Sequence, residues 1–499
     1  MTAVTRGEGG PARVLVGAGV VLVVVCSVVG FVRAFQPGHT GMGMGMDMGP
    51  KLRGMPLPDM PEMFLAGAGI LVVLTGVLLR GPRRAPVATA RTGVRGRGLV
   101  AFVATTALTI DISKTSTLGF VIPGMRAEYG IGASTAALLA VGGLSGTATG
   151  ALVFSRLADQ IGRRGSYLLA TLGFTATSMC GCMPSFGGNV TMCFLMGIAV
   201  GGLAPMLVTI LADLFPGGSR GPVVAALSMV ATALGYLIAS GSALWLEPTF
   251  GWRVLWLIGA PIGLLLALAT VLVPERALRA IAQHDDAGPV VPEPAGTAFT
   301  TRLQWLYAGV VGLLTFGLTT WVPTLARAGG LSLTTANTLL TVVALAMVPC
   351  AVLLTLAYRR FGAIPLAVRL AVTTAGVLLA LTVSGLTSTV TWLSAAVLAA
   401  ALFAVNTMAA IFLPIAADLA DVRRRGRTTG TVSFFNRVGG LLGPLVLALV
   451  VSSVTDVLVA VAVLALLCGA IAWYTGHRYR AAQRATPPDE HRDSRVRAG

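Results

Sequence analysis

Apolar segments of about 20 residues recur along nearly the whole chain of 499 residues, and this feature restricts the fold more than any other. A helix needs about 20 apolar residues to cross the hydrocarbon core of a bilayer. A β-barrel would instead show shorter segments in which apolar and polar residues alternate. Only 11% of the residues are charged, whereas soluble domains average about 25%. The sequence therefore predicts an all-α integral membrane protein.

The apolar segments predict fourteen membrane spans. Two come first, at residues 13–35 and 63–80. Twelve follow, at residues 99–122, 134–155, 166–184, 190–214, 222–246, 252–273, 303–326, 334–357, 364–385, 389–417, 428–451 and 454–476. The polar residues between them divide the chain into a two-helix extension (1–80) with a loop at 36–62, a basic linker (81–98), a first six-helix half (99–273), a central loop (274–301), a second six-helix half (302–476) and a tail (477–499).

The net charge of +17 does not indicate a nucleic-acid partner, because the arginines lie in short loops between apolar segments. Positively charged residues gather in the cytoplasmic loops of membrane proteins. We therefore place the linker, the central loop and both termini in the cytoplasm, and the 36–62 loop outside it. The first apolar segment has no small-residue cleavage site, so we interpret it as a retained span rather than a signal peptide. The predicted setting is a monomer in the lipid bilayer of a bacterial inner membrane.

The two six-helix halves contain a weak internal repeat. The segment "ADLFPGGSRG" at residues 212–221 aligns without gaps with "ADLADVRRRG" at residues 417–426. Each segment follows the fourth span of its half, and the same offset places Gly235 over Gly440. Repeated halves are typical of secondary transporters, whose substrate sites lie at mid-membrane between the repeats.

The loop "SRLADQIGRR" at residues 155–164 resembles the signature loop of the major facilitator superfamily. The residues that match the pattern are Leu157, Ala158, Asp159, Gly162, Arg163 and Arg164. Ser155 replaces the usual first glycine and Gln160 the usual arginine. The segments "GWRVLWLIGAP" and "VPER" resemble the same family, and the resemblance covers about residues 99–476. It implies a twelve-helix transporter core, to which the two N-terminal helices are an addition.

The resemblance implies a gate at this loop. In the family such charges are thought to latch the two halves together in one state and to release them in the other. The candidate gating residues are Asp159, Gly162, Arg163, Arg164, Asp213 and Arg220. The equivalent loop of the second half, "LAYRRFGAIP", has no acid. The alternative interpretation is that the arginines only anchor the topology.

Three charged residues lie deep within predicted spans, where charges are costly and tend to be functional. Asp111 and Lys114 lie in the first core span, and Arg437 lies in the eleventh. The resemblance implies that the first span of each half lines the central cavity, so we expect Asp111 and Lys114 to face it. Asp111 could carry a coupling proton, while Lys114 or Arg437 could bind an anionic substrate. The alternative is that Asp111 and Lys114, one turn apart, neutralise each other. Further candidate polar groups of the cavity are Asn436, Asn406 and Trp321.

The 36–62 loop is rich in methionine, glycine and proline. Thioether sulfur is a soft ligand that selects Cu(I) and its analogue Ag(I). The candidate ligands of this loop are His39, Met42, Met44, Met46 and Met48, and those of a second sulfur-rich segment are Cys180, Cys182 and Cys193. The alternatives are a low-complexity linker for the loop and soft packing residues for the second segment.

These observations predict a secondary active transporter that is coupled to protons and carries a small organic solute, in particular an anionic one. Two alternatives stay open, a copper or silver transporter of the same fold and a non-transporting membrane metal sensor or receptor. An enzyme is not predicted, because the sequence has no nucleotide-binding loop, nucleophile motif or catalytic zinc spacing. No cofactor is expected apart from Cu(I) or Ag(I) at the methionine-rich loop.

Overall fold

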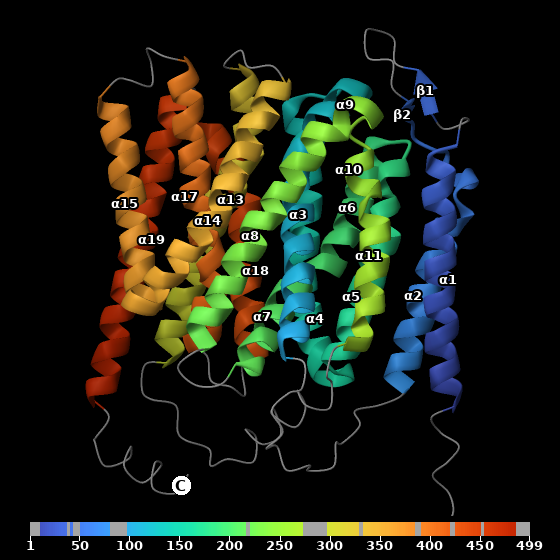
Figure 1. Cartoon of the computed structure of the whole chain (residues 1–499), viewed down its shortest axis with the longest axis horizontal. Coiled ribbons are helices and arrows are strands. Elements are labelled where there is room, and N and C mark those ends of the chain that lie inside the picture. Colours follow the sequence, from blue (N-terminus) through green and yellow to red (C-terminus); the bar gives the residue numbers. More distant parts are fainter. Residues whose placement is uncertain are drawn as a thin grey trace, which may run out of the picture.

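The structure is a computed structural model, and it describes residues 10–36, 40–42, 50–79, 97–215, 220–272, 297–328, 333–384, 391–419, 425–450 and 454–485. The described part is a bundle of long helices that run in roughly the same direction (Figure 1). Eleven of its helices are long and apolar enough to cross a membrane. The prediction of an all-α membrane protein is therefore confirmed.

The N-terminal extension is a pair of packed helices at one edge of the bundle (Figure 1). Its elements are α1 (Gly10–Ala34), β1 (Thr40–Met42), β2 (Pro50–Leu52), η2 (Leu57–Asp59) and α2 (Pro61–Leu79). The strands β1 and β2 pair antiparallel, and we call this end of the bundle the hairpin end. A Cβ on Gly19 would lie 2.7 Å from the Gly69 carbonyl oxygen, so glycine lets α1 and α2 approach closely. Arg33 donates to both carboxylate oxygens of Glu62, at 2.9 and 3.0 Å.

The extension packs against the first half at the hairpin end. The Met55 amide donates to the Cys182 carbonyl at 2.7 Å. A Cβ on Gly54 would lie 2.7 Å from the Pro184 Cα, so only glycine fits there. The buried Arg253 holds the adjoining turn, because its guanidinium donates to the Gly181 and Met183 carbonyls and pairs with Glu128 at 2.6 Å.

The first half has the following elements: α3 (Arg97–Tyr129), α4 (Ala133–Ile161), α5 (Arg163–Thr177), η3 (Ser178–Cys182), α6 (Phe186–Gly201), α7 (Leu203–Leu214), α8 (Arg220–Trp245), α9 (Glu247–Phe250), α10 (Val254–Leu257), α11 (Gly259–Leu268) and η5 (Ala269–Leu272). Two predicted spans are interrupted. The span at 190–214 is divided at Gly202, where a Cβ would collide with Phe154, and the span at 252–273 is divided between α10 and α11.

The second half has six long helices: α13 (Thr297–Ala328), α14 (Leu333–Phe361), α15 (Ala363–Val383), α17 (Thr391–Leu419), α18 (Arg425–Val450) and α19 (Val454–Ala485). The backbones of α13 and α18 are in direct contact. A Cβ on Gly439 would collide with the Gly309 carbonyl, and a Cβ on Gly312 would collide with the Asn436 carbonyl. This glycine seam fixes the position of α18 against α13.

The predicted repeat has a structural counterpart. Gly162 after α4 and Gly362 after α14 adopt the same positive φ, 87° and 81°, and each amide donates back to the fourth preceding carbonyl. Gly235 packs on α3 of the first half, and Gly440 packs on α13 of the second. Both pairs therefore occupy equivalent places in the two halves.

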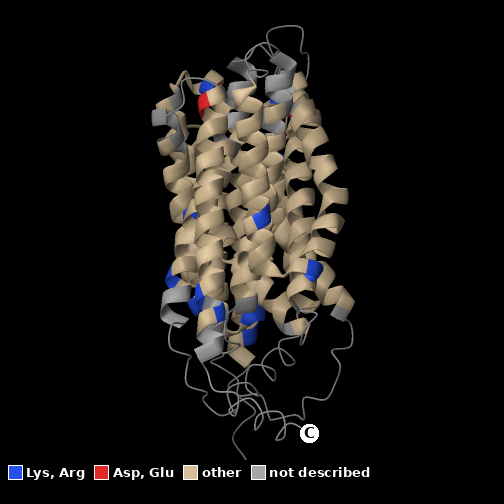
Figure 2. Ribbon diagram, turned by 90° about the vertical axis from the view of Figure 1, so that its left-hand side faces the viewer, with Lys and Arg blue, Asp and Glu red and all other residues tan. Residues whose placement is uncertain are grey.

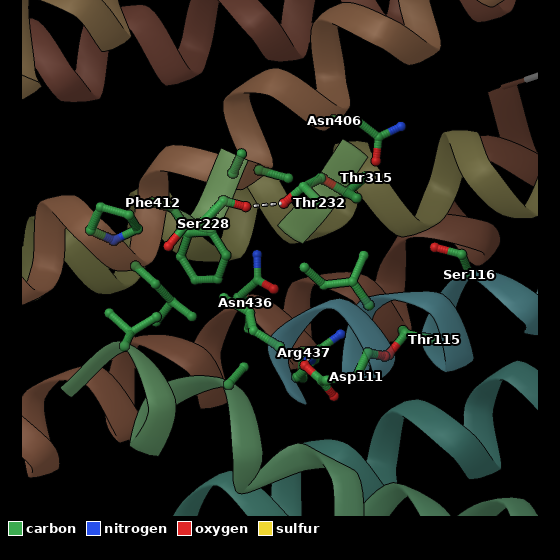
Figure 3. Close-up of a pocket in the computed structure, with 18 of the residues that line it drawn as sticks. Asp111, Thr115, Ser116, Ser228, Thr232, Thr315, Asn406, Phe412, Asn436 and Arg437 are labelled. Atoms are coloured by element: carbon green, nitrogen blue, oxygen red, sulfur yellow. Dashed lines mark hydrogen bonds and ion pairs between the residues drawn. The ribbon is translucent and has the colours of Figure 1, made fainter. Parts of the chain in front are cut away.

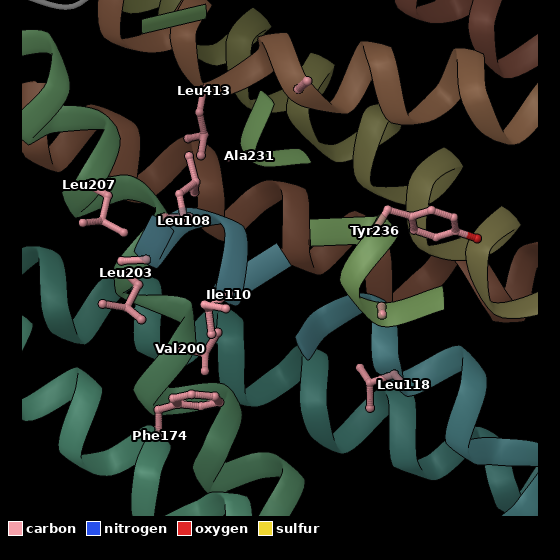
Figure 4. Packing of buried hydrophobic residues seen from close by; sticks show 14 of the residues in the cluster. Leu108, Ile110, Leu118, Phe174, Val200, Leu203, Leu207, Ala231, Tyr236 and Leu413 are labelled. Atoms are coloured by element: carbon pink, nitrogen blue, oxygen red, sulfur yellow. The ribbon is translucent and has the colours of Figure 1, made fainter. Parts of the chain in front are cut away.

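The hydrophobic core holds α3 at the centre of the first half. Figure 4 shows Leu108 and Ile110 of α3 beside side chains of α6 and α7, among them Val200 and Leu203. Charged residues are rare along the bundle, and in Figure 2 the basic residues of the face shown lie mainly at the end opposite the hairpin. The few charged residues buried between the helices are therefore candidates for functional residues.

A candidate substrate site between the two halves

The main cavity lies between the two halves and has a volume of about 100 Å³. Its walls come from α3, α7 and α8 of the first half and from α13, α17 and α18 of the second (Figure 3). The polar residues that line it are Asp111, Thr115, Ser116, Ser228, Thr232, Thr315, Asn406, Asn436 and Arg437. The other lining residues are apolar, and they include Phe316 and Phe412. The cavity thus offers one acid, one base and a mixed apolar wall.

Asp111 and Arg437 face each other across the boundary between the halves (Figure 3). The distance from the Arg437 Nη2 atom to the Asp111 Oδ2 atom is 3.8 Å, and both side chains are buried. Neither Asp111 oxygen has a hydrogen-bond partner among the described residues, and neither does the Arg437 Nε atom. A buried ion pair that lacks supporting hydrogen bonds recovers little of its desolvation cost. The pair therefore has capacity for an additional polar ligand.

The surroundings of Arg437 favour a flat anion. Its guanidinium carbon lies 5.0 Å from the centre of the Phe316 ring. The neighbouring Asn436 side chain donates to the Ala308 carbonyl at 3.0 Å, so it anchors α18 to α13. Guanidinium groups bind carboxylates through two parallel hydrogen bonds. The arrangement can hold a carboxylate next to an aromatic ring.

Lys114 does not share the environment of Asp111. Its ammonium donates to the Leu255 carbonyl at 2.7 Å, in the interrupted sixth core span. Lys114 lines a separate cavity of about 20 Å³ together with Cys193 and Met196. The residue is not part of the main cavity wall. The expectation that Lys114 faces the central cavity is therefore not met, and Asp111 is paired with Arg437 rather than neutralised by Lys114.

The candidate gating loop lies where the halves touch, at the end opposite the hairpin. The hydroxyl groups of Thr209 and Thr429 are 3.1 Å apart, and a Cβ on Gly430 would lie 2.7 Å from the Ser155 Cβ. Gly162 ends α4 with a positive φ, and α5 begins at Arg163 and Arg164. The side chains of Asp159, Asp213, Arg220 and Trp321 lie outside the described residues.

The candidate metal ligands are only partly described. His39, Met44, Met46 and Met48 lie outside the described residues, as does the side chain of Met42. Cys180, Cys182 and Cys193 are buried and form no disulfide bond. The described part of the chain contains no group of three or more His, Cys, Asp or Glu side chains that could hold a metal ion.

Sequence reasoning missed the hydroxyl groups of the cavity wall. Ser228 and Thr232 lie one turn apart on α8 and point into the cavity (Figure 3). The Thr232 hydroxyl donates to the Ser228 carbonyl at 2.9 Å, while the buried Ser228 hydroxyl has no partner among the described residues. Two hydroxyl residues four positions apart in an apolar span were the available signal. Asn406, which the sequence did suggest, lines the same cavity.

Comparison with known proteins agrees with this arrangement. A family model described as the Major Facilitator Superfamily matches residues 97–444 and 330–498. A gallate transporter of Pseudomonas putida is 29% identical over 263 residues, which cover 44% of this chain and 57% of the relative. A 4-hydroxybenzoate transporter, PcaK of Acinetobacter baylyi, is 27% identical over 277 residues, which cover 48% of this chain and 60% of the relative. The matches thus span somewhat more than half the length of these relatives.

The fold also resembles solved structures. The proton:xylose symporter XylE bound to 6-bromo-6-deoxy-D-glucose aligns with a TM-score of 0.62 and 13% sequence identity. The alignment covers 77% of this chain and 96% of that structure. At such low identity the likeness concerns the fold alone.

Proposed function

Because the chain belongs to the major facilitator superfamily, we propose that it is a proton-coupled transporter of a small aromatic carboxylate. The substrate binds in the main cavity, with its carboxylate on Arg437 and its ring beside Phe316. The observation that carries this proposal is a buried arginine with unused hydrogen-bonding capacity, in contact with an aromatic ring inside a cavity between the halves. The gallate and 4-hydroxybenzoate named for two relatives belong to this chemical class.

The charges around the cavity favour an anion. Among the described residues, the charged groups that line the main cavity or lie within one helical turn of it are Asp111, Lys114 and Arg437. Together they carry a net charge of +1 when all three are ionised. An uncompensated charge inside a membrane protein is costly. A bound carboxylate offsets the additional positive charge that the site gains when Asp111 takes up a proton.

The size of the cavity limits the substrate to a small molecule. The main cavity measures about 100 Å³, which is less than the apolar cavity of about 150 Å³ that holds benzene in an engineered protein, so a single-ring carboxylate enters only if the walls move slightly apart. Phe316 and Phe412 supply aromatic surface, and Ser228, Thr232 and Asn406 supply groups that can bond to polar ring substituents. A disaccharide or a peptide would exceed this space without a large rearrangement.

Coupling follows from competition for Arg437. When Asp111 is ionised, its carboxylate attracts the guanidinium. When Asp111 takes up a proton, that attraction is lost and Arg437 can bind the substrate carboxylate instead. Substrate and proton thus favour the same state, which is the requirement for cotransport. Alternating access then exposes the loaded site on the other side of the membrane.

The rest of the molecule supplies the moving halves, the latch and the N-terminal extension. The two six-helix halves (99–273 and 302–476) rock about the cavity in a bacterial inner membrane, with the termini in the cytoplasm. Asp159, Arg163 and Arg164 act with Asp213 and Arg220 as the cytoplasmic latch, and the contact between Thr209 and Thr429 at the same end supports this role. The extension (1–80) travels with the first half, because the contacts described for Gly54 and Met55 join it to that half.

The first test is binding and uptake of 4-hydroxybenzoate by the purified protein. Isothermal titration calorimetry in detergent should show saturable binding, and proteoliposomes should accumulate the compound under an inward proton gradient. Arg437→Gln removes a charged hydrogen-bond donor, a loss of roughly 1.5–3 kcal/mol, or about 10- to 150-fold in affinity. Arg369→Gln is the matched control, because Arg369 lies on α15 over the Phe361 ring and outside the cavity. Equal affinities in both variants would refute the proposal.

The methionine-rich loop supports a separate, accessory proposal, namely that it binds Cu(I) or Ag(I) without supplying the transported substrate. The support is the run of four methionines from Met42 to Met48, which offers four soft thioether ligands beside the carboxylate of Asp47. Replacing these four by leucine should abolish Ag(I) binding and leave 4-hydroxybenzoate uptake unchanged. Loss of both would instead show that the loop takes part in transport and is not an accessory.

A further inference from the structure

Asp111 faces a single charged side chain from the helices packed around it. That side chain is Arg437 of α18, at 3.8 Å. The cavity residues contributed by α7, α8 and α13 are uncharged: Ala204, Val208, Ser228, Thr232, Thr315 and Phe316. Other charged or titratable groups on the packed helices include Arg156 of α4, Cys193 of α6, Tyr236 of α8 and Arg302 and Tyr307 of α13, and none of these lines the main cavity. The described wall of the cavity thus has one group that can release and regain a proton under ordinary conditions, the Asp111 carboxyl.

The two cationic groups near Asp111 do not add a second proton to the transport step. A guanidinium stays protonated in proteins, so Arg437 only exchanges one anionic partner for another. Lys114 lies on α3 itself, but its ammonium is held by the Leu255 carbonyl and borders the separate cavity of about 20 Å³. Lys114 is therefore not part of the wall against which the substrate and the Asp111 proton are held.

We propose that each transport cycle moves one monocarboxylate together with one proton, so that no net charge crosses the membrane with the substrate. This inference rests on the proposed function. On the loading side, the Asp111 carboxylate takes one proton and becomes a neutral carboxylic acid, and Arg437 binds the substrate carboxylate. On the release side, Asp111 gives up the same proton and pairs again with Arg437, which expels the substrate. One negative and one positive charge are carried, and no bond in the substrate changes.

The stoichiometry has a direct consequence for the driving force. A monocarboxylate that moves with one proton accumulates about tenfold for each unit of pH gradient, and about a hundredfold if it moves with two. A membrane potential by itself contributes nothing in the first case, because it acts only on net charge. A dicarboxylate would retain one uncompensated negative charge and should be transported poorly.

The experiment uses the full-length protein in proteoliposomes with radiolabelled 4-hydroxybenzoate. One set of vesicles has a pH gradient, with the potential clamped at zero by potassium and valinomycin. A second set has a potassium diffusion potential at equal pH. We expect about tenfold accumulation per pH unit in the first set and equal concentrations inside and outside in the second. Accumulation that follows the potential, or a slope of about a hundredfold per pH unit, would overturn the inference.

Two further readouts separate this inference from the proposed function. If calorimetry detects no carboxylate binding, the proposed function itself fails. If binding occurs and uptake follows the potential, the function stands and only the one-proton assignment fails. Asp111→Asn should abolish accumulation under the pH gradient while it preserves exchange of labelled for unlabelled substrate. Accumulation that persists in this variant would place the proton on another residue.

Discussion

A buried arginine in a membrane protein is stabilised by a negative partner. For Arg437 the two candidate partners are the Asp111 carboxylate and the carboxylate of the proposed substrate. Asp111 lies too far away for a hydrogen bond, and the Arg437 Nε atom has no partner among the described residues. A ligand carboxylate can approach more closely than the helix-bound Asp111 does. The long ion pair is therefore better suited to exchange than a tight one would be, because breaking it costs little.

The spacing of Asp111 and Lys114 allowed mutual neutralisation as an alternative interpretation, and the structure gives each residue a different partner. The partners, Arg437 and Leu255, lie far away in the sequence. They come close because α3 lines the same cavity as α18 and packs against α10. A single sequence shows which charges are buried, because apolar neighbours surround them. It does not show which distant residue each charge meets.

Ser228 is expected to recognise a hydroxyl group on the ring. Its buried hydroxyl has no partner among the described residues, and Ser228 lines the same cavity as Arg437 (Figure 3). Ser228→Ala should weaken binding of 4-hydroxybenzoate by about 0.5–1.5 kcal/mol, roughly 2- to 12-fold, which is the worth of one neutral hydrogen bond. Benzoate, which has no ring hydroxyl, should bind equally to both proteins. Titration calorimetry with the two ligands measures the difference, and equal losses for both would remove Ser228 from a role in specificity.

At the scale of elements, the glycine seam between α13 and α18 sets the position of Arg437. A methyl group at Gly439 would collide with the Gly309 carbonyl. Gly439→Ala should therefore destabilise the protein by about 1–3 kcal/mol, as overpacking usually does. The matched control is Gly376→Ala in α15, where a Cβ would meet nothing within 4 Å. That change should be neutral or stabilise by about 0.5–1 kcal/mol, because alanine favours a helix more than glycine does. Thermal unfolding in detergent compares the two, and equal shifts would mean that the seam is not closely packed.

The positions of the helices were predictable and their interruptions were not. Each of the fourteen predicted spans overlaps a helix or a broken pair of helices, because length and hydropathy are enforced by the bilayer itself. Helix α6 ends at Gly201 and α10 ends at Leu257, and each of these residues lies four positions before a proline, Pro205 or Pro261, that cannot donate to its carbonyl. Hydropathy averaged over a span does not register such prolines.

On the scale of the whole molecule, the contact between Ser155 and Gly430 joins the two halves at the end opposite the hairpin. A Cβ on Gly430 would lie 2.7 Å from the Ser155 Cβ, whereas the Cβ atoms of a disulfide lie about 3.5–4.5 Å apart, so the two helices must move slightly apart for the bond to form. The double variant Ser155→Cys with Gly430→Cys should form a cross-link under oxidation and lose net uptake, since the halves can no longer separate there. Reduction should restore uptake.

The control is each single cysteine variant treated in the same way, which should transport normally before and after oxidation. Mass spectrometry of a proteolytic digest verifies the bond. Full transport by a cross-linked protein would show that the halves do not separate at this end, and alternating access would then need a different hinge.

The docking of the extension has a consequence for the order in which the protein is assembled. Gly54 and Met55 are made early, but Arg253, which completes the turn they pack on, is made about 200 residues later. At bacterial and eukaryotic synthesis rates that delay is roughly 10–40 s. During this time the pair of α1 and α2 must persist without the completed turn, and its own Gly19–Gly69 contact and the Arg33–Glu62 pair allow it to do so. Helices α1 and α2 are thus made well before the surface on which they finally pack is complete.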